Sequence, residues 1–470
     1  MWEASRDWGA AVDAYLSLLA PTPAHDIAAC EAAWLSAVRL AGQWQRDRWM
    51  GVCEEVAHRL AENGRWEAAG GLFRDLGQPD RACDCYVRGG AWKLAREAAV
   101  GNAALSGAVE GAARKAAIAS GSGDEMRAAG ALEAALASYS AAGQYDKLFE
   151  AAGQAGAGVL AKYLYPRAAE LLAGDASAPP SHARGLEVLA YLEKYGAPPE
   201  AGALPIYVRL CRALFHADSG HVYPPPLPLL TRARAVLYKL VAALRRAGAG
   251  ANPVGTVLAE FEHCLLAVHY AEMRCILEGA GAPELAARAA ATLLRFTDLL
   301  PADAAFFDAG CAARSAGDKS SALVLLNRFI DLSVALEEGE RDSACVEDGG
   351  ELRDAGFLAP GAFPLPPRPY VSSKAREEAN TWVLATSMDR KVSAALASRA
   401  CSSCGRAQPA CALVCAGCTS VQPACVVTGA PIPAAQLVEC PGCGSKASTV
   451  AWAAMVGKTR TCCWCACPAK

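Results

Sequence analysis

The sequence contains little charge, and the charge it has is nearly balanced. Only 20% of its residues are Asp, Glu, Lys or Arg, and the formal net charge over 470 residues is −3. A nearly neutral chain gives no electrostatic reason to expect nucleic acid or an acidic membrane surface as a partner. We therefore expect no nucleic-acid binding.

Long apolar runs are missing too. No uncharged apolar run approaches the roughly 20 residues that a membrane-spanning helix needs, and residues 1–6 hold neither a basic leader nor an apolar core. We expect no membrane insertion and a location in the cytoplasm. The chain also starts within an amphipathic pattern, without the polar capping unit of a solenoid end. We therefore expect it to be a piece of a longer protein.

Catalytic motifs are also lacking. The sequence offers no Ser-His-Asp set, no Gly-Lys-Ser phosphate loop and no paired catalytic carboxylates. The glycines between Gly153 and Gly158 follow no predicted strand, so they do not predict a dinucleotide loop. His263 and His269 are six residues apart, do not share a helix face well, and are interpreted as ordinary helix histidines. Apart from a ligase activity considered below, we expect no enzyme.

What the sequence does contain favours a helical body of more than one unit. The chain is too long for a single compact core. Its hydrophobic content is 53%, and much of this is alanine, a strong helix former. We expect a mainly α protein.

A unit of 13 residues recurs in the first 160 residues. Glycines, alanines and aromatic residues keep this spacing: Gly64, Gly77 and Gly90; Ala69, Ala82 and Ala95; Phe73 and Tyr86; and later Gly130, Gly143 and Gly156. Glycine supplies the left-handed backbone that ends a helix, and small alanines let helices approach closely. Helices of about ten residues are unstable alone and must stack. The pattern predicts a TPR-like α-solenoid of helical hairpins; a generic Ala-rich bundle is the alternative.

The helical pattern lengthens after residue 184 and ends near residue 336. Apolar residues recur at three-and-four spacing over 185–195, 204–215, 229–247, 257–277, 284–300, 304–315 and 318–336. Glu272 is a polar exception on an apolar face. The arginine charges on these helices are interpreted as solvated faces: Arg232, Arg234, Arg245 and Arg246. We assign residues 1–336 to the solenoid.

An acidic and Pro-rich stretch, residues 337–371, predicts a linker. Residues 372–470 then form the terminal unit. Ser373 is a candidate N-cap for a helix that presents Ala379, Trp382, Val383 and Thr386 on one face. We expect this helix to dock the final domain.

Cysteines are concentrated in that final domain. Twelve of the 21 cysteines lie between Cys401 and Cys467, and eight of them form CxxC pairs: Cys401/Cys404, Cys415/Cys418, Cys440/Cys443 and Cys462/Cys465. A CxxC turn supplies two tetrahedral zinc ligands, usually with a nearby glycine. Eight thiolates predict two structural zinc ions, closed to water, that give order to a segment with few large apolar residues. The nine scattered cysteines are interpreted as small buried hydrophobes.

The pairing of the four CxxC turns is left open by the sequence. Sequential pairing gives two ribbons, and interleaved pairing gives a cross-brace of the RING type. A disordered or disulfide-linked tail and iron–sulfur ligation are alternatives to zinc. One of the remaining cysteines, Cys411, Cys425, Cys463 or Cys467, could also replace an assigned ligand.

The segment between the second and third pairs resembles the opening of U-box domains, which share the RING fold. It runs Cys425-Val426-Val427-Thr428-Gly429-Ala430-Pro431. Mapped by motif, the resemblance gives Val427 and Pro431 a contact with a ubiquitin-conjugating enzyme or ubiquitin, although Val426 stands where the family has Pro. A plain hydrophobic strand turning at Thr428 is the alternative. We expect a small α+β, zinc-stabilised RING/U-box-like domain, with ubiquitin-pathway binding and weak ligase activity as the second functional hypothesis.

Three segments resemble the C-terminal region of the largest subunit of intraflagellar transport complex B. They lie at residues 322–332 with 337–339, at 382–390 (Trp382-Val383-Leu384-Ala385-Thr386-Ser387-Met388-Asp389-Arg390) and at 425–429. The resemblance implies a fragment without the family's N-terminal β-propellers. It also implies a scaffold role in transport trains, other train subunits as partners, and a place in the cilium, flagellum and basal body. Many members of that family lack the CxxC pairs.

Overall fold

The computed structural model describes residues 6–18, 26–173, 181–216, 223–247, 254–340 and 365–468. These residues form two compact units, Met1–Ala151 and Ala152–Lys470. The predicted boundary near residue 336 falls inside the second unit, and it stays a prediction about folding units. Most of the predicted linker, residues 341–364, lies outside the described residues.

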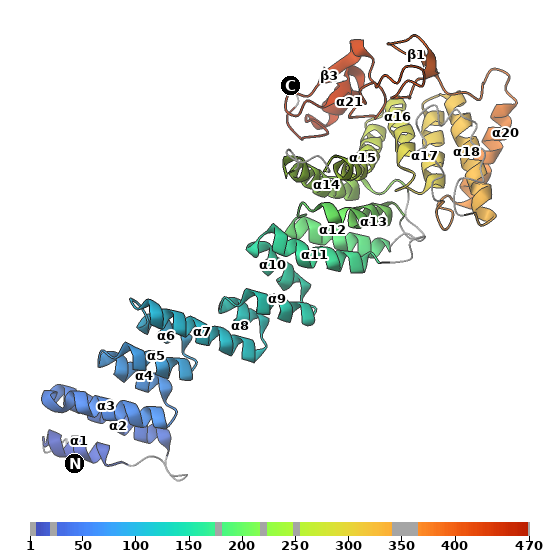
Figure 1. The fold of residues 1–470 in the computed structure, drawn as a ribbon. Coiled ribbons are helices and arrows are strands. Elements are labelled where there is room, and N and C mark those ends of the chain that lie inside the picture. The colour runs from blue at the N-terminus through green and yellow to red at the C-terminus, as the bar shows by residue number, and fades with distance from the viewer. Residues whose placement is uncertain are drawn as a thin grey trace. The chain divides into compact units, whose positions relative to one another are not determined.

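Helices of 6 to 18 residues make up the first unit (Figure 1), and from α1 to α9 each helix packs on the next one in sequence. They are α1 (Trp8–Leu16), α2 (Ile27–Trp44), α3 (Arg46–Glu62), α4 (Trp66–Asp75), α5 (Pro79–Arg88), α6 (Trp92–Ala98), α7 (Ala103–Ser120), α8 (Gly123–Ala128), α9 (Leu132–Ala141) and α10 (Tyr145–Ala155), whose end crosses into the second unit. Packing between neighbours along the chain is the defining property of a solenoid. The predicted solenoid is confirmed.

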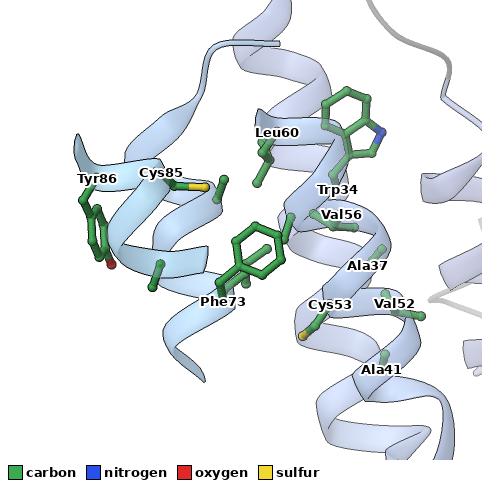
Figure 2. Close-up of a cluster of buried hydrophobic side chains, with 14 of the residues drawn as sticks. Trp34, Ala37, Ala41, Val52, Cys53, Val56, Leu60, Phe73, Cys85 and Tyr86 are labelled. Atoms are coloured by element: carbon green, nitrogen blue, oxygen red, sulfur yellow. The ribbon is translucent and has the colours of Figure 1, made fainter. Parts of the chain in front are cut away.

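The 13-residue unit has the structural meaning that the sequence suggested. Gly64, Gly77 and Gly90 end successive helices with φ of 73°, 72° and 71°, in the left-handed region that glycine adopts without strain. Ala69, Ala82 and Ala95 are completely buried. Figure 2 shows Phe73 of α4 pointing toward α3, which carries Val56 and Leu60. The repeat therefore combines a glycine turn, a close helix contact and an aromatic filler.

Longer helices form most of the second unit. They are α11 (Ala157–Leu171), α12 (His182–Tyr195), α13 (Leu204–Phe215), α14 (Leu227–Ala247), α15 (Val254–Gly279), α16 (Pro283–Leu293), α17 (Ala302–Ser315), α18 (Lys319–Glu337), α20 (Ser373–Ser387) and α21 (Thr449–Thr459). The predicted helices match these within a few residues at most ends. The exception is the stretch predicted to run to residue 300, which stops as an α-helix at Leu293 and tightens into a 3₁₀ turn, Leu294–Phe296. No described helix is long and apolar enough to cross a membrane.

Helix α20 lies beside α18 (Figure 1) and packs against it. Its buried Ala379 and Val383 join the core that α17 and α18 form. The helix therefore extends the solenoid stack. Val392, Leu396 and Cys411, which follow it in the chain, pack against the same core, and the docking role expected of this helix stays a prediction. Its N-cap is Ser372, one residue before the predicted Ser373, because the Ser372 hydroxyl accepts the N–H of Ala375 at 3.3 Å.

The terminal module, residues 398–468, consists of tight hairpins and one helix. Strand β1 (Ser398–Ala400) pairs antiparallel with β2 (Ala407–Pro409), and β3 (Leu437–Glu439) pairs antiparallel with β4 (Lys446–Ser448). Single antiparallel bridges join three further pairs: Val414 with Val421, Ala424 with Pro431, and Thr461 with Pro468. The module therefore presents five hairpin turns. The α-solenoid followed by a small domain of metal-binding type is the fold that the sequence predicted.

Candidate metal centres

Four thiols converge at the end of the β1–β2 hairpin. Cys401, Cys404, Cys415 and Cys418 place their sulfur atoms within 4.8 Å of one another. The Sγ atoms of Cys401 and Cys418 are 3.7 Å apart, and those of Cys404 and Cys415 are also 3.7 Å apart. We call this set the distal group.

A second set of four thiols converges beside the β3–β4 hairpin. Cys440, Cys443, Cys462 and Cys465 also lie within 4.8 Å of one another. The Sγ atoms of Cys440 and Cys465 are 3.8 Å apart, and those of Cys443 and Cys462 are 3.9 Å apart. We call this set the proximal group.

All four CxxC turns have one backbone geometry. In each, the residue after the second cysteine has positive φ and donates its N–H to the carbonyl of the first cysteine: Gly405 (2.9 Å), Thr419 (2.8 Å), Gly444 (2.8 Å) and Ala466 (2.9 Å). The first cysteine of each turn is buried, whereas Cys404 and Cys443 are exposed. Each turn therefore aims two sulfur atoms at one point, with one of them near solvent.

The sulfur positions fit a tetrahedral ion. Zinc–sulfur bonds of about 2.3 Å imply sulfur–sulfur edges of about 3.8 Å, which the measured distances of 3.7–3.9 Å match. A disulfide would require about 2.05 Å. Because four thiols complete the tetrahedron, neither group leaves a position for water or substrate. Either group would therefore hold a metal as a structural element.

Hydrogen bonds lower the pKa of Cys401 and Cys418 in the distal group and of Cys462 in the proximal group, which favours the thiolates that a cation binds. The Ser420 hydroxyl, with backbone N–H groups, lowers the pKa of Cys401 to about 5. The pKa of Cys462 is lowered to about 4, first by a hydrogen bond from Cys463. Burial and neighbouring thiols raise the pKa of Cys465 instead. Four adjacent thiolates need a cation to coexist, because like charges at this distance disfavour ionisation.

The structure resolves the pairing that the sequence left open. The first CxxC pair joins the second, and the third joins the fourth, so the pairing is sequential. The interleaved cross-brace of the RING type, which the U-box resemblance favoured, does not occur. Cys411, Cys425, Cys463 and Cys467 lie outside both groups. Gly442 leaves room for Cys467, since a Cβ at residue 442 would lie 2.8 Å from the Cys467 sulfur.

The fifth hairpin turn, residues 425–431, repeats the same geometry without a second cysteine. Gly429 has φ of 69° and donates its N–H to the Cys425 carbonyl at 2.6 Å, while Thr428 stands where the CxxC turns have a cysteine. Ser448 donates its backbone N–H to the Cys425 sulfur at 3.4 Å. Hydrogen bonds thus hold this turn, which we call the docking loop.

The docking loop lies against the solenoid. Val427 is completely buried, and Pro431 is half-buried. Val427 shares one hydrophobic cluster with Met273 and Leu277 of α15 and with Leu285 of α16. Val427, buried in this way, is not available to a conjugating enzyme in this conformation, whereas Pro431 keeps part of its surface exposed. The contact expected of these two residues stays a prediction.

Two residues of α15 and α16 bind the backbone of the docking loop. His269 is completely buried, and its Nε2–H donates to the Val426 carbonyl at 2.7 Å. The Thr292 hydroxyl donates to the Thr428 carbonyl at 2.8 Å. Gly429 is required here, because a Cβ would lie 2.2 Å from the Thr292 methyl carbon.

Two arginines extend this contact to other turns of the module. Arg295 donates to the carbonyls of Gly429 (2.9 Å) and Cys411 (3.0 Å). Arg234 of α14 donates to the carbonyls of Cys463 and Trp464, and its Nε donates to His269 Nδ1 at 3.1 Å. Both guanidinium groups therefore bind backbone carbonyls of the terminal module.

The sequence did not identify these docking residues. Arg234 was interpreted as a solvated charge, which is wrong: its side chain is 14% exposed, and it pairs with Glu272 at 3.3 Å. Glu272 was the signal in the sequence that could have identified Arg234. A carboxylate on the apolar face of a helix needs a buried cationic partner. Arg232 and Arg245 are the surface charges that were expected, and they pair with Glu193 and Glu262.

The scattered cysteines are mostly buried, as expected. Cys30, Cys53, Cys83, Cys85, Cys211 and Cys264 are buried, and Cys275 and Cys311 are partly exposed. Burial raises the pKa of Cys53 to about 11, so this thiol stays protonated at neutral pH. Cys345 lies outside the described residues.

The chain is similar to proteins named for intraflagellar transport. Intraflagellar transport protein 172 of Chlamydomonas reinhardtii is 31% identical over 435 residues, which are 92% of this chain and 24% of that protein. Its human homologue is 30% identical over 397 residues, 83% of this chain and 21% of that protein. Intraflagellar transport protein osm-1 of Caenorhabditis elegans is 34% identical over 213 residues, 43% of this chain and 11% of that protein.

Two other comparisons add little. No family model matches the chain. A solved circular tandem repeat protein with a novel repeat topology is 14% identical and covers 77% of this chain and 85% of its own, but the TM-score is 0.18.

The relatives are much longer than this chain, which spans at most about a quarter of the length of those named above. Their names refer to intraflagellar transport and give no support to the ubiquitin hypothesis. The resemblance seen in the sequence is confirmed: the chain belongs to the intraflagellar transport protein 172 family and corresponds to a C-terminal part of its members.

Proposed function

We propose that the chain is a scaffold part of an intraflagellar transport train in the cilium or flagellum. The observation that carries this proposal is the match to intraflagellar transport protein 172 over 92% of the chain. Stacked helices present long surfaces to several partners at once. The solenoid would bind other train subunits, and the terminal module would provide a further docking site.

The two cysteine groups would each hold one structural zinc ion. Eight thiolates in two closed tetrahedra support zinc, since a closed site of four cysteines stabilises a fold and leaves no position for catalysis. Bound zinc would supply cross-links to a module that lacks a large core of its own. The backbone hydrogen bonds that close the four CxxC turns would hold the ligand cysteines in position for the metal.

A chimera tests the scaffold role. Chlamydomonas cells that lack intraflagellar transport protein 172 receive a chimera of that protein, in which this chain replaces the matching C-terminal segment. We expect flagella to assemble and the chimera to co-purify with other train subunits. A chimera with the same segment deleted is the control. If the chimera accumulates normally but neither enters trains nor supports flagella, the scaffold role is wrong.

Metal analysis tests the zinc assignment separately. The purified full chain is measured by native mass spectrometry and by elemental analysis. We expect two zinc ions per chain, and one in a variant that lacks the distal cysteines. A folded chain that contains no metal, or iron in its place, would overturn the assignment.

A further inference from the structure

The two cysteine groups differ in what lies behind them. The distal group stands at the end of the β1–β2 hairpin, and its neighbouring bridge residues Val414 and Val421 are 52% and 74% exposed. Between its two turns, the Cys411 carbonyl accepts from Arg295 at 3.0 Å, but in the part of the chain that the structure describes no residue of the turns themselves has a contact of this kind. The proximal group includes the turn Cys462–Cys465, whose two middle residues, Cys463 and Trp464, contact the solenoid. This turn, which we call the proximal turn, therefore has one side that faces the metal site and one side that faces the solenoid.

The solenoid-facing side of the proximal turn is made of backbone carbonyls and one indole. Arg234 donates through the same nitrogen to the carbonyls of Cys463 and, at 2.7 Å, Trp464. The Trp464 ring packs edge-on against His269, at 5.0 Å between centroids, and against Tyr238, at 5.8 Å. These contacts require the two carbonyls to point together toward α14.

The metal-binding geometry of the turn fixes that direction. Ala466 donates its N–H to the Cys462 carbonyl at 2.9 Å, and Trp464 donates its N–H to the Cys462 sulfur at 3.4 Å. Ala466 has φ of 58°, a conformation that alanine adopts only when its surroundings impose it. Without a metal to hold Cys462 and Cys465 together, the unfavourable backbone conformation of Ala466 is no longer stabilised, and we expect the turn to relax.

We propose that metal binding at the proximal group controls whether the terminal module is docked on α14–α16. The proposal rests on the metal assignment above and adds a regulatory role for one of the two sites. With the proximal metal bound, Arg234 and His269 hold the proximal turn and the adjacent docking loop. With that metal removed, the turn relaxes, Arg234 loses its paired carbonyls, and the docking loop leaves the solenoid.

Release would uncover a matched pair of apolar surfaces. On the module these are Val426, Val427 and Ile432, which are 9%, 0% and 1% exposed when docked. On the solenoid they are Met273 and Leu277 of α15, with α16 beside them. The proximal metal therefore decides whether these apolar residues are covered or exposed. The distal metal does not, because no described residue of its two turns belongs to this cluster, whereas Cys463 and Trp464 of the proximal turn do.

Matched cysteine variants of the full chain test the proposal. One carries Cys443→Ser with Cys462→Ser, and the other carries Cys404→Ser with Cys415→Ser. Metal content is measured on both, and hydrogen–deuterium exchange is followed in peptides that cover residues 263–276 and 285–295. We expect each variant to keep one metal. The proximal variant should exchange at least tenfold faster in these two peptides, and the distal variant at the rate of the unaltered chain.

Two results would overturn the proposal. Unchanged exchange in the proximal variant would show that docking is independent of the metal, and equal acceleration in both variants would show that the groups are not distinct. Absence of metal from the unaltered chain would instead defeat the zinc assignment. The two failures are therefore distinguishable.

A second pair of variants covers the case in which losing cysteines unfolds the whole module. Arg234→Lys keeps a charge beside Glu272 but loses the planar fork that reaches two carbonyls and His269. Arg232→Lys alters an exposed pair with Glu193 and is the control. We expect Arg234→Lys to keep two metals and to accelerate exchange in residues 263–276 at least threefold. Exchange equal to that of the control would contradict the proposal.

Discussion

The repeats of the first unit and the terminal module obtain their order in different ways. Between Gly64 and Ala99 each helix packs on its neighbours in sequence, and the core is built from alanines and aromatic residues of adjacent turns. In the module, Val427 instead packs on Met273 and Leu285, more than 130 residues away. The repeats are thus held by local contacts, whereas the module depends on thiolate groups and on a surface that the solenoid provides.

Removing metal should separate the two regions most strongly. Each structural zinc contributes on the order of 10 kcal/mol of folding free energy in small domains. A strong chelator should therefore abolish amide protection in residues 437–448 and leave residues 66–98 unchanged. Hydrogen–deuterium exchange before and after chelation measures both. Full protection of the β3–β4 hairpin in the chelator would show that the thiol groups do not hold the module.

The converse test removes an aromatic filler from the repeats. Phe73 is 3% exposed and packs edge-on against His58. Phe73→Ala should lower the free energy of unfolding of the first unit by about 3–5 kcal/mol, because it removes buried area and leaves a cavity. Urea denaturation followed by exchange in residues 50–98 measures this. Val100→Ala, at an 83% exposed position, should change it by no more than about 0.5 kcal/mol. Metal content should be unaffected in both variants.

A glycine pair separates backbone strain from steric contact in the module. Gly429 and Gly444 have the same φ of 69°, but a Cβ at residue 429 would lie 2.2 Å from Thr292, and one at 444 meets nothing within 4 Å. Gly444→Ala should cost only the backbone term of about 1–2 kcal/mol. Gly429→Ala should cost about 1–3 kcal/mol more, because the solenoid surface must move.

Thermal unfolding and exchange of residues 285–295 measure this pair. Only Gly429→Ala should accelerate exchange on the solenoid. Ala466, which already occupies the position of Gly444 in another CxxC turn with φ of 58°, shows that the backbone accepts a Cβ there. Equal losses of stability and equal exchange rates in the two variants would mean that Gly429 is not in close contact with Thr292.

The sequence predicted what depends on local pattern. Gly64 and Gly77 predicted helix ends, and the segment 204–215 predicted α13 to the residue. The eight ligand cysteines were also found, because the CxxC spacing has a direct geometric meaning. All of these signals lie within about 13 residues of chain.

The sequence did not predict what depends on distant contacts. The pairing of CxxC turns cannot be read from spacing, since both pairings use the same turns. The docking role of Arg234 depends on carbonyls 229 and 230 residues away, and backbone carbonyls carry no sequence signal. For the same reason the turn at Thr428 and Gly429 was predicted, but its burial against Thr292 was not.

Acid should weaken the docking of the terminal module on the solenoid, because it protonates His269. This is the smallest of the effects that we expect. Burial first, and then the charge of Arg234, lower the pKa of His269 to about 3. Its ordinary pKa is about 6.5, so the undocked state binds a proton more readily between these values. The sign follows: docking is strongest above about pH 6.5 and weakens as the pH falls toward 3. At pH 5.5 the loss is about 1.4 kcal/mol relative to pH 7.5.

The substitution His269→Gln isolates this effect from acid loss of metal. Glutamine can donate to the Val426 carbonyl and accept from Arg234 as the neutral imidazole does, but it does not titrate. Protonation of the cysteine ligands is common to both proteins and cancels in their difference. Glu272, which also faces Arg234, is unchanged in the variant. Exchange in residues 285–295 should therefore rise about tenfold more in the unaltered chain than in the variant between pH 7.5 and 5.5, after correction for the intrinsic pH dependence of exchange. Parallel curves for the two proteins would show that the imidazole does not set the acid sensitivity of docking, and would place that sensitivity in the thiolate groups.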